Sequence, residues 1–132
     1  MRQDALDAAH PPVVLVVDDD EDSLSIMCTT LESQGLCALG ASTGDEAVTA
    51  TRGMLPDLVV IDLVLVGEDG WSVLQRLRSE QGLSDVPCLV VTAASSPENR
   101  ERARHYQALR YMEKPLPPRA FAAAVAEMLR DA

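Results

Sequence analysis

Apolar runs of strand length alternate along this chain with stretches in which apolar residues recur at helical spacing. The runs predict five strands, at residues 13–17, 36–41, 58–61, 88–91 and 109–112. Several of these runs are apolar throughout, which is typical of strands buried on both faces of a parallel sheet. The pattern therefore indicates a sheet that is covered on both sides.

Helical spacing and end signals predict a helix after each strand. These helices are expected at about residues 22–34, 43–53, 70–80, 97–107 and 119–130. Thr43 and Glu46 have capping-box spacing, and Ser96 precedes a proline at the first helical position. Strands that alternate with helices imply right-handed crossovers. The sequence thus predicts a doubly wound α/β domain of three layers, with a five-stranded parallel sheet in the middle.

The chain has the length and composition of one globular domain, with 132 residues, of which 47% are apolar and 24% charged. Residues 1–12 are expected to form a flexible tail, and residues 13–132 the domain. No apolar run approaches the roughly 18–20 residues that span a membrane, so no membrane association is expected. The first residues contain no apolar stretch of signal-peptide length.

The balance of charge is strongly acidic, with 21 acids against 11 bases and a formal net charge of −10. This argues against direct binding of nucleic acid by the chain, because phosphates require a basic face. It fits a basic partner or a bound cation. Cys28, Cys37 and Cys88 lie among apolar neighbours and form no C-x-x-C pair, so we expect buried free thiols in a reducing cytoplasm.

Polar residues collect where the predicted strands end. Asp18 and Asp19 follow the first strand, Asp62 the third, Thr92 ends the fourth and Lys114 follows the fifth. Because ligands of open parallel sheets bind beyond the carboxyl ends of the strands, these side chains are expected to share one site. The further acids at residues 20–22 also suit a solvated helix N-terminus, where the helix dipole favours negative charge.

Asp62 stands inside an otherwise apolar run, and a carboxylate in such a place needs a partner. If Asp62 lies about 5 Å from Asp18 and Asp19, each pair repels by about 3 kcal/mol at an effective dielectric of about 20. A bound cation would relieve that repulsion, and oxygen-only ligands suit Mg²⁺. Lys114 is the single lysine among eleven basic residues, and its compact ammonium could balance carboxylates and then a phosphoryl oxygen.

With these residues in place, the chain resembles the receiver domains of bacterial response regulators, of which the chemotaxis regulator is the familiar stand-alone member. The resemblance covers about residues 13–129. It is carried, in order and at family-like spacing, by Val16-Val17-Asp18-Asp19, Pro56-Asp57-Leu58 with Asp62, Asp69-Gly70, Val91-Thr92-Ala93 and Lys114-Pro115.

The resemblance implies a flavodoxin-like sheet of order 2-1-3-4-5 and a cis peptide bond before Pro115. It also implies a role for each site residue: Asp62 as phosphoacceptor, Asp18, Asp19, Asp62 and the Val64 carbonyl as ligands of Mg²⁺ or Mn²⁺, Thr92 and Lys114 on the phosphoryl oxygens, and Tyr111 as the switch aromatic. The family is cytoplasmic and takes its phosphoryl group from a sensor histidine kinase or a phosphotransfer protein. Such a domain catalyses only its own phosphorylation and dephosphorylation, and its output is a changed surface of the fourth helix, fifth strand and last helix.

The chain departs from the family where Val66 replaces the usual proline, which puts the placing of the Val64 carbonyl, and hence Mg²⁺ affinity, in question. Val64 and Ala94 occupy the positions that flank the approach of water in the family. Neither side chain can orient a water, so self-dephosphorylation is expected to be slow.

Two other classes share parts of this pattern. A phosphohydrolase of the haloacid dehalogenase type uses a strand-end Asp, a Thr and a Lys, but its nucleophile would be Asp18, and Asp22 stands where that motif has Thr or Val. A flavodoxin-like FMN-binding module would need a phosphate loop where this chain has five acids. The sequence leaves three questions open. These are the identity of the output partner, whether phosphorylation produces a homodimer, and whether the natural protein is a stand-alone regulator or a longer one.

Overall fold

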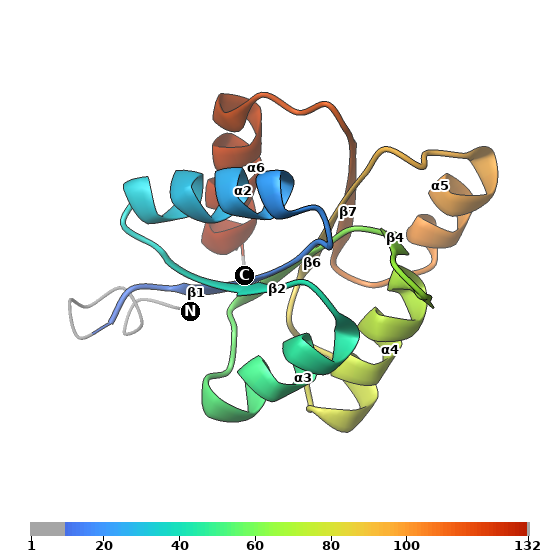
Figure 1. Cartoon of the computed structure of the whole chain (residues 1–132), viewed down its shortest axis with the longest axis horizontal. Helices are drawn as coiled ribbons and strands as arrows, with labels where there is room; N and C mark the ends of the chain where they lie inside the picture. Colours follow the sequence, from blue (N-terminus) through green and yellow to red (C-terminus); the bar gives the residue numbers. More distant parts are fainter. Residues whose placement is uncertain (1–9, 132) are drawn as a thin grey trace.

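The computed structural model describes residues 10–131 and contains the expected five-stranded parallel sheet (Figure 1). Its strands are β1 (Val13–Val17), β2 (Cys37–Ala41), β3 (Leu58–Ile61), β6 (Cys88–Thr92) and β7 (Leu109–Glu113). They lie in the order β2-β1-β3-β6-β7 and all pair in parallel. The doubly wound fold and its strand order are therefore confirmed. Most of the expected N-terminal tail lies outside the described residues.

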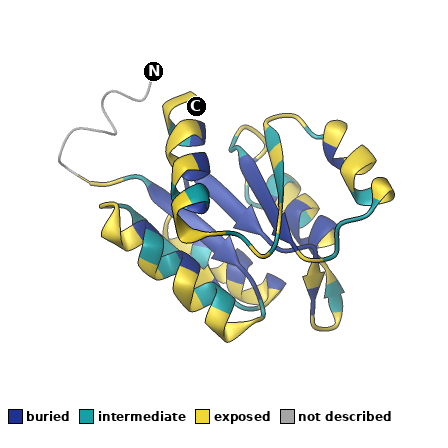
Figure 2. Ribbon diagram, turned by 90° about the horizontal axis from the view of Figure 1, so that it is seen from above, coloured by how far each residue is buried: buried dark blue, intermediate teal, exposed yellow. Residues whose placement is uncertain are grey.

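Helices cover both faces of the sheet (Figure 1). One face carries α2 (Glu21–Ser33) and α6 (Pro118–Asp131), and the other carries α3 (Gly44–Gly53), α4 (Gly70–Glu80) and α5 (Pro97–Arg104). Alternate residues of each strand enter opposite clusters, so that Leu15 packs towards α3 and α4 while Val16 packs towards α2 and α6. The central strands β1, β3 and β6 are buried along their whole length between these layers, whereas the edge strands β2 and β7 are partly exposed (Figure 2).

Side-chain caps fix where the helices begin. The carboxylate or hydroxyl oxygens of Asp20, Thr43, Asp69 and Ser96 each accept a backbone N–H of the following first turn. Several element boundaries differ from the sequence prediction: α2 begins one residue early, at 21, β2 begins one residue late, β6 and β7 run one residue further, and α5 ends at 104 rather than 107. The cis peptide bond between Lys114 and Pro115 is present as expected.

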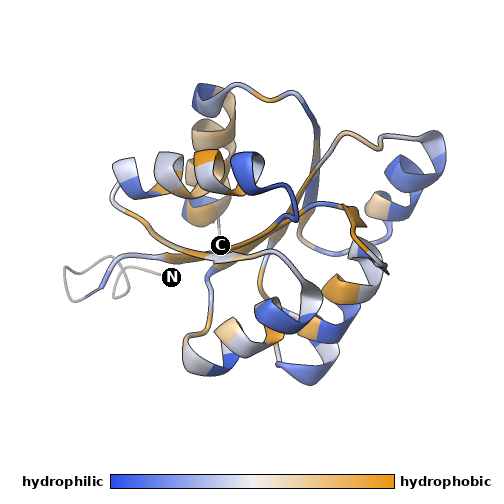
Figure 3. Ribbon diagram, in the orientation of Figure 1, coloured by the Kyte–Doolittle hydropathy of each residue, from blue (hydrophilic) through white to orange (hydrophobic). Residues whose placement is uncertain are grey.

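A short hairpin follows β3 that the sequence did not predict. Its strands are β4 (Val64–Leu65) and β5 (Glu68–Asp69), which pair antiparallel. Leu65 points into the core, whereas Val64 and Val66 are among the most exposed large apolar residues. The hairpin therefore places the exposed apolar side chain of Val64 beside Asp62, and its apolar part is the short orange stretch after β3 in Figure 3.

The cysteines are less buried than the sequence suggested. Cys88 is fully buried, and burial raises the pKa of its thiol to about 12. Cys28 and Cys37 are only half-buried, since Cys37 lies on the edge strand β2 and Cys28 on the flank of α2. All three are free thiols. Within residues 10–131, no helix is long and apolar enough to cross a membrane.

Candidate functional site

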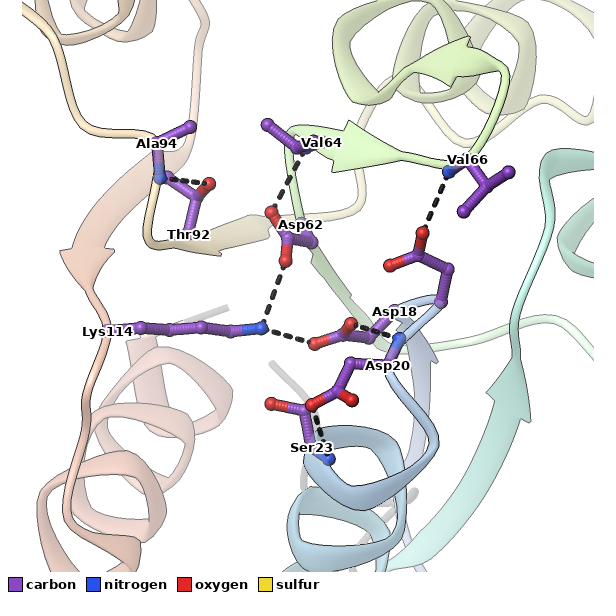
Figure 4. Close-up of polar contacts among 10 residues, drawn as sticks. Asp18, Asp20, Ser23, Asp62, Val64, Val66, Thr92, Ala94 and Lys114 are labelled. Atoms are coloured by element: carbon purple, nitrogen blue, oxygen red, sulfur yellow. Dashed lines mark hydrogen bonds and ion pairs between the residues drawn. The ribbon is translucent and has the colours of Figure 1, made fainter.

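The strand-end residues meet at the carboxyl edge of the sheet. Asp18 follows β1, Asp62 follows β3, Thr92 ends β6 and Lys114 comes one residue after β7. Asp18 and Thr92 are fully buried, and Asp62 is 8% exposed. Four residues that are far apart in the sequence thus form one polar cluster in an otherwise apolar core (Figure 4).

Lys114 joins the two buried carboxylates. Its Nζ donates to Asp18 Oδ2 at 2.6 Å and to Asp62 Oδ2 at 2.9 Å (Figure 4). Burial alone lowers the pKa of the Lys114 ammonium, but its hydrogen bonds to these carboxylates and their negative charges outweigh burial and hold that pKa above its usual value. The Lys114 ammonium therefore relieves the repulsion between the Asp18 and Asp62 carboxylates. From the sequence alone, a bound cation was expected to relieve it.

The second oxygen of each carboxylate is held by a nearby backbone group. Asp18 Oδ1 accepts the N–H of Asp20 at 2.9 Å, and Asp62 Oδ1 accepts the N–H of Val64 at 3.1 Å. Both carboxylates are consequently satisfied on both oxygens, which lowers the cost of burying them. They are also fixed in direction before any ligand arrives.

Asp19 does not join this pair. Its Oδ2 accepts the backbone N–H of Val66 at 2.8 Å, which ties the β1–α2 loop to the tip of the hairpin. In residues 10–131, no three His, Cys, Asp or Glu side chains converge as metal ligands. The donor set nevertheless suits a hard divalent cation: Asp18, Asp19 and Asp62 carry three negative charges against one on Lys114, and their ligand atoms are all oxygen.

Thr92 and Ala94 form a local turn on the other side of Asp62. The Thr92 Oγ1 accepts the backbone N–H of Ala94 at 3.1 Å (Figure 4). In that bond the hydroxyl oxygen is the acceptor, so the hydroxyl hydrogen is available to a further acceptor. Ala94 is half-buried, and Val64, across the site, is 57% exposed.

Tyr111 lies on β7 with its ring beneath the guanidinium of Arg100, whose Cζ is 5.2 Å from the ring centroid. Arg100 also forms an ion pair with Glu113. The Tyr111 hydroxyl is buried without a hydrogen-bond partner among the described residues. An orphaned buried donor of this kind marks a side chain that would gain from a rearrangement.

Two features of the site had no clear signal in the sequence. A Cβ on Gly70 would lie 2.3 Å from the Asp62 carbonyl oxygen, so only glycine lets α4 begin this close to the loop after β3; of this closeness the sequence offered only the Asp69-Gly70 pair as a sign. Asn99 accepts the Trp71 indole N–H at 3.1 Å and donates to the Ala94 carbonyl at 3.0 Å. Nothing in the spacing of Asn99 pointed to this link between α4, α5 and the Thr92 loop.

The aromatic side chains offer no flavin platform. Trp71 stacks on Tyr106, with ring centroids 5.0 Å apart, and Arg102 and Arg78 cover the outer faces of this pair. Both rings are therefore already occupied by neighbours within the chain, and the FMN-binding alternative gains no support from them.

Comparison with known proteins gives a consistent result. The model of the response regulator receiver domain family matches residues 14–126. The chain is 35% identical over 117 residues to a probable transcriptional regulator ycf27 of Porphyridium aerugineum (89% of this chain, 48% of the relative). It is 30% identical over 117 residues to the phosphate regulon transcriptional regulatory protein PhoB of Escherichia coli (89% and 51%).

Among solved structures, the fold is similar to a CheY-like response regulator receiver domain protein from Methanospirillum hungatei. The two share 25% sequence identity with a TM-score of 0.83, over 92% of this chain and 95% of the other. The chain spans about half the length of the curated relatives it matches.

Proposed function

The chain belongs to the response regulator receiver domain family, and on that premise we propose that Asp62 accepts a phosphoryl group in a two-component phosphorelay. Members of this family are signalling modules of two-component systems rather than conventional enzymes. The observation that carries the proposal is the Lys114 ammonium held between the Asp18 and Asp62 carboxylates. It places a mobile positive charge beside a buried nucleophile, which is what phosphoryl transfer to a carboxylate requires.

In the proposed reaction, a carboxylate oxygen of Asp62 attacks the phosphorus of a phosphohistidine in line with the bond to be broken. The new O–P bond forms as the N–P bond breaks, and the leaving imidazole nitrogen keeps the electron pair. Lys114 turns from Asp62 to one phosphoryl oxygen, and the Thr92 hydroxyl donates its hydrogen to another. Both groups are within the cluster before the donor arrives, so little reorganisation is needed.

Asp18, Asp19, Asp62 and the Val64 carbonyl would hold the Mg²⁺ ion, or Mn²⁺ in its place. The ion supplies charge neutralisation to the transferring phosphoryl group. The protein's own part is to supply oxygen ligands and to exclude bulk water from the buried oxygens of Asp18 and Asp62. The net charge of −2 among these residues and Lys114 supports a divalent cation.

The output of the proposed reaction is a changed surface. Once Thr92 bonds a phosphoryl oxygen, its turn with Ala94 alters and the Tyr111 side chain can move to satisfy its hydroxyl. The surface that changes comprises α5, β7 and α6. This is a shift between two conformations that differ in affinity for the phosphoryl group.

A sensor histidine kinase or a phosphotransfer protein is the proposed donor. An apolar groove of about 360 Å³ lies beside Lys114 and is lined in part by Ile26, Met27, Leu116 and Phe121. The groove and the nearby acidic β1–α2 loop suit a partner with an apolar helix face and basic flanks. The three free cysteines suit a cytoplasmic setting.

The proposal is tested by incubating the protein with acetyl phosphate and Mg²⁺ and mapping the phosphorylated residue by mass spectrometry. Asp62 is the expected site, and Asp62→Asn is expected to take up no phosphate. Asp45→Asn is the matched control, because Asp45 is an exposed carboxylate whose partner is a surface arginine. Phosphate on Asp18, or uptake by Asp62→Asn, would show instead that the hydrolase alternative or another acceptor is correct.

A further inference from the structure

The tip of the β4–β5 hairpin is fastened to the predicted metal-binding loop by one hydrogen bond. The backbone N–H of Val66 donates to Asp19 Oδ2 at 2.8 Å, across 47 residues of sequence (Figure 4). The Val66 side chain itself is 82% exposed and contributes little packing. The link between these segments therefore depends on the main chain of Val66 and the carboxylate of Asp19.

The geometry of the turn explains why this N–H is available. Val66 and Gly67 are the two residues between the paired positions Leu65 and Glu68. Gly67 has a φ of 74°, and among residues 10–131 Ala108 is the one non-glycine residue with a positive φ, so φ at Val66 is negative. These signs match a type II turn with Val66 at its second position, whose N–H takes no part in the turn.

The same hairpin is anchored on its other strand. Glu68 Oε2 accepts the backbone N–H of Gly44 at 2.8 Å, which joins the hairpin to the beginning of α3. Two carboxylates thus fasten the hairpin: Asp19 reaches it from the β1–α2 loop, and the hairpin's own Glu68 reaches out to α3. Of these two contacts, only the one to Asp19 involves a residue of the predicted metal site, so it is the one that a bound cation would affect.

We propose that the Val66 N–H competes with the divalent cation for the Asp19 carboxylate. Asp19 stands apart from Asp18 and Asp62, and no three acidic side chains of the described chain converge on a metal position. In this proposal, the Asp19 carboxylate leaves the Val66 N–H when it joins the other two on the cation. This inference rests on the proposed metal-dependent function and adds a regulatory element to it.

The competition has two consequences. Binding of Mg²⁺ has to break the hydrogen bond between Asp19 and Val66, and this costs part of the binding free energy. The affinity for Mg²⁺ is therefore lower than the ligand set alone would give. Metal binding also releases the tip of the hairpin. Because the same hairpin carries Val64, metal binding changes the mobility of the segment beside Asp62.

Val66→Pro tests the proposal, because proline is favoured at the second position of a type II turn and has no N–H. Isothermal titration calorimetry with MgCl₂ alone, without phosphodonor, is expected to show affinity about three- to tenfold higher than in the parent, as an exposed hydrogen bond is weak. Val66→Ala is the matched control: it removes the exposed side chain, keeps the N–H and should leave the affinity unchanged.

A stiffer turn could also raise the affinity, so a second measurement isolates the hydrogen bond. In nitrogen-labelled parent protein, the Val66 amide is expected to exchange faster and to shift upfield when Mg²⁺ saturates the site. Unchanged or lower affinity in Val66→Pro, or a Val66 amide that stays protected in Mg²⁺, overturns the competition while leaving the proposed function intact. Failure of the parent to bind Mg²⁺ would overturn both.

Discussion

The two sides of Asp62 are built differently. On one side, which we call the metal flank (Asp18, Asp19, Val64 and Val66), hydrogen bonds join segments that are distant in sequence, as in the Val66–Asp19 and Lys114–Asp18 contacts. On the other, the switch flank (Thr92, Ala94 and Tyr111), the Thr92 hydroxyl bonds only two residues away and the Tyr111 hydroxyl has no partner within the described chain.

The helices next to these flanks differ in the same way. Helix α4, which begins beside Asp62, buries five residues: Gly70, Trp71, Val73, Leu74 and Leu77. Helix α5, which follows the switch flank, buries only Ala103. A helix with so little buried apolar surface is held weakly and is the natural element to move. The metal flank is therefore held together by hydrogen bonds in the resting state, whereas the switch flank can be rearranged at low cost.

The largest effect is expected when the Lys114 ammonium between the Asp18 and Asp62 carboxylates is removed. Lys114→Met leaves the Asp18 and Asp62 carboxylates buried and facing one another, and should lower the free energy of unfolding by about 3 kcal/mol in metal-free buffer. Urea unfolding at neutral pH measures this, and added Mg²⁺ should restore part of the loss. Arg76→Met, which removes two exposed ion pairs, with Asp45 and Glu80, should cost less than about 1 kcal/mol. Equal midpoints for the two variants would contradict a pre-organised metal flank.

Removing Asp19 should weaken Mg²⁺ binding by at least about tenfold, because one of the proposed ligands is lost. The fluorescence of Trp71, which is buried next to Gly70, offers a direct readout. Asp22→Ala is the control, since Asp22 is an exposed acid in the first turn of α2, three residues from Asp19, and its loss changes the net charge equally. If both variants bind Mg²⁺ as tightly as the parent, Asp19 is not a ligand.

Val64 and Ala94, one on each flank, are expected to control how long the phosphoryl group persists. Val64→Asn combined with Ala94→Glu supplies polar groups that can orient water, and should speed dephosphorylation about tenfold. The decay is followed with Mg²⁺ present after the donor is removed. Ala93→Glu places a carboxylate on the exposed neighbouring residue and should have little effect. If the double variant loses its phosphoryl group at the parent's rate, these two positions do not orient the attacking water.

The smallest effect on stability is expected on the switch flank. Tyr111→Phe removes a hydroxyl that has no partner, so the free energy of unfolding should change by less than about 0.5 kcal/mol. Tyr111→Ala also removes the ring that packs on the core and under Arg100, and should cost about 2 kcal/mol. A large loss of stability in Tyr111→Phe would mean that its hydroxyl is already bound in the resting state.

The sequence predicted the fold well because apolar runs and caps are local signals. The β1 and β3 runs, the Thr43 cap and the Ser96 cap each determine an element without reference to distant residues. The gathering of Asp18, Asp62, Thr92 and Lys114 also followed from the sequence, since a parallel sheet brings all its strand ends to one edge.

What the sequence did not predict depends on contacts between distant segments. The two-residue strands of the hairpin are too short for any periodic pattern, and the partner of Asp19 is a backbone group that no residue identity reveals. The position of Asn99 between Trp71 and Ala94 likewise follows from how α5 docks, not from its own helix. The half-burial of Cys37 reflects its place on an edge strand.

Amide hydrogen exchange, with and without acetyl phosphate in the presence of Mg²⁺, measures the proposed switch from Asp62 to the surface of α5, β7 and α6. In the parent, phosphorylation should change exchange in the Thr92–Ala94 turn, α5, β7 and the beginning of α6, while β1 and β3 stay as they were. Asp62→Asn should show none of these changes under the same conditions. Exchange that is unaltered across the switch flank of the phosphorylated parent, or altered equally in Asp62→Asn, would contradict a switch that is driven by phosphorylation of Asp62.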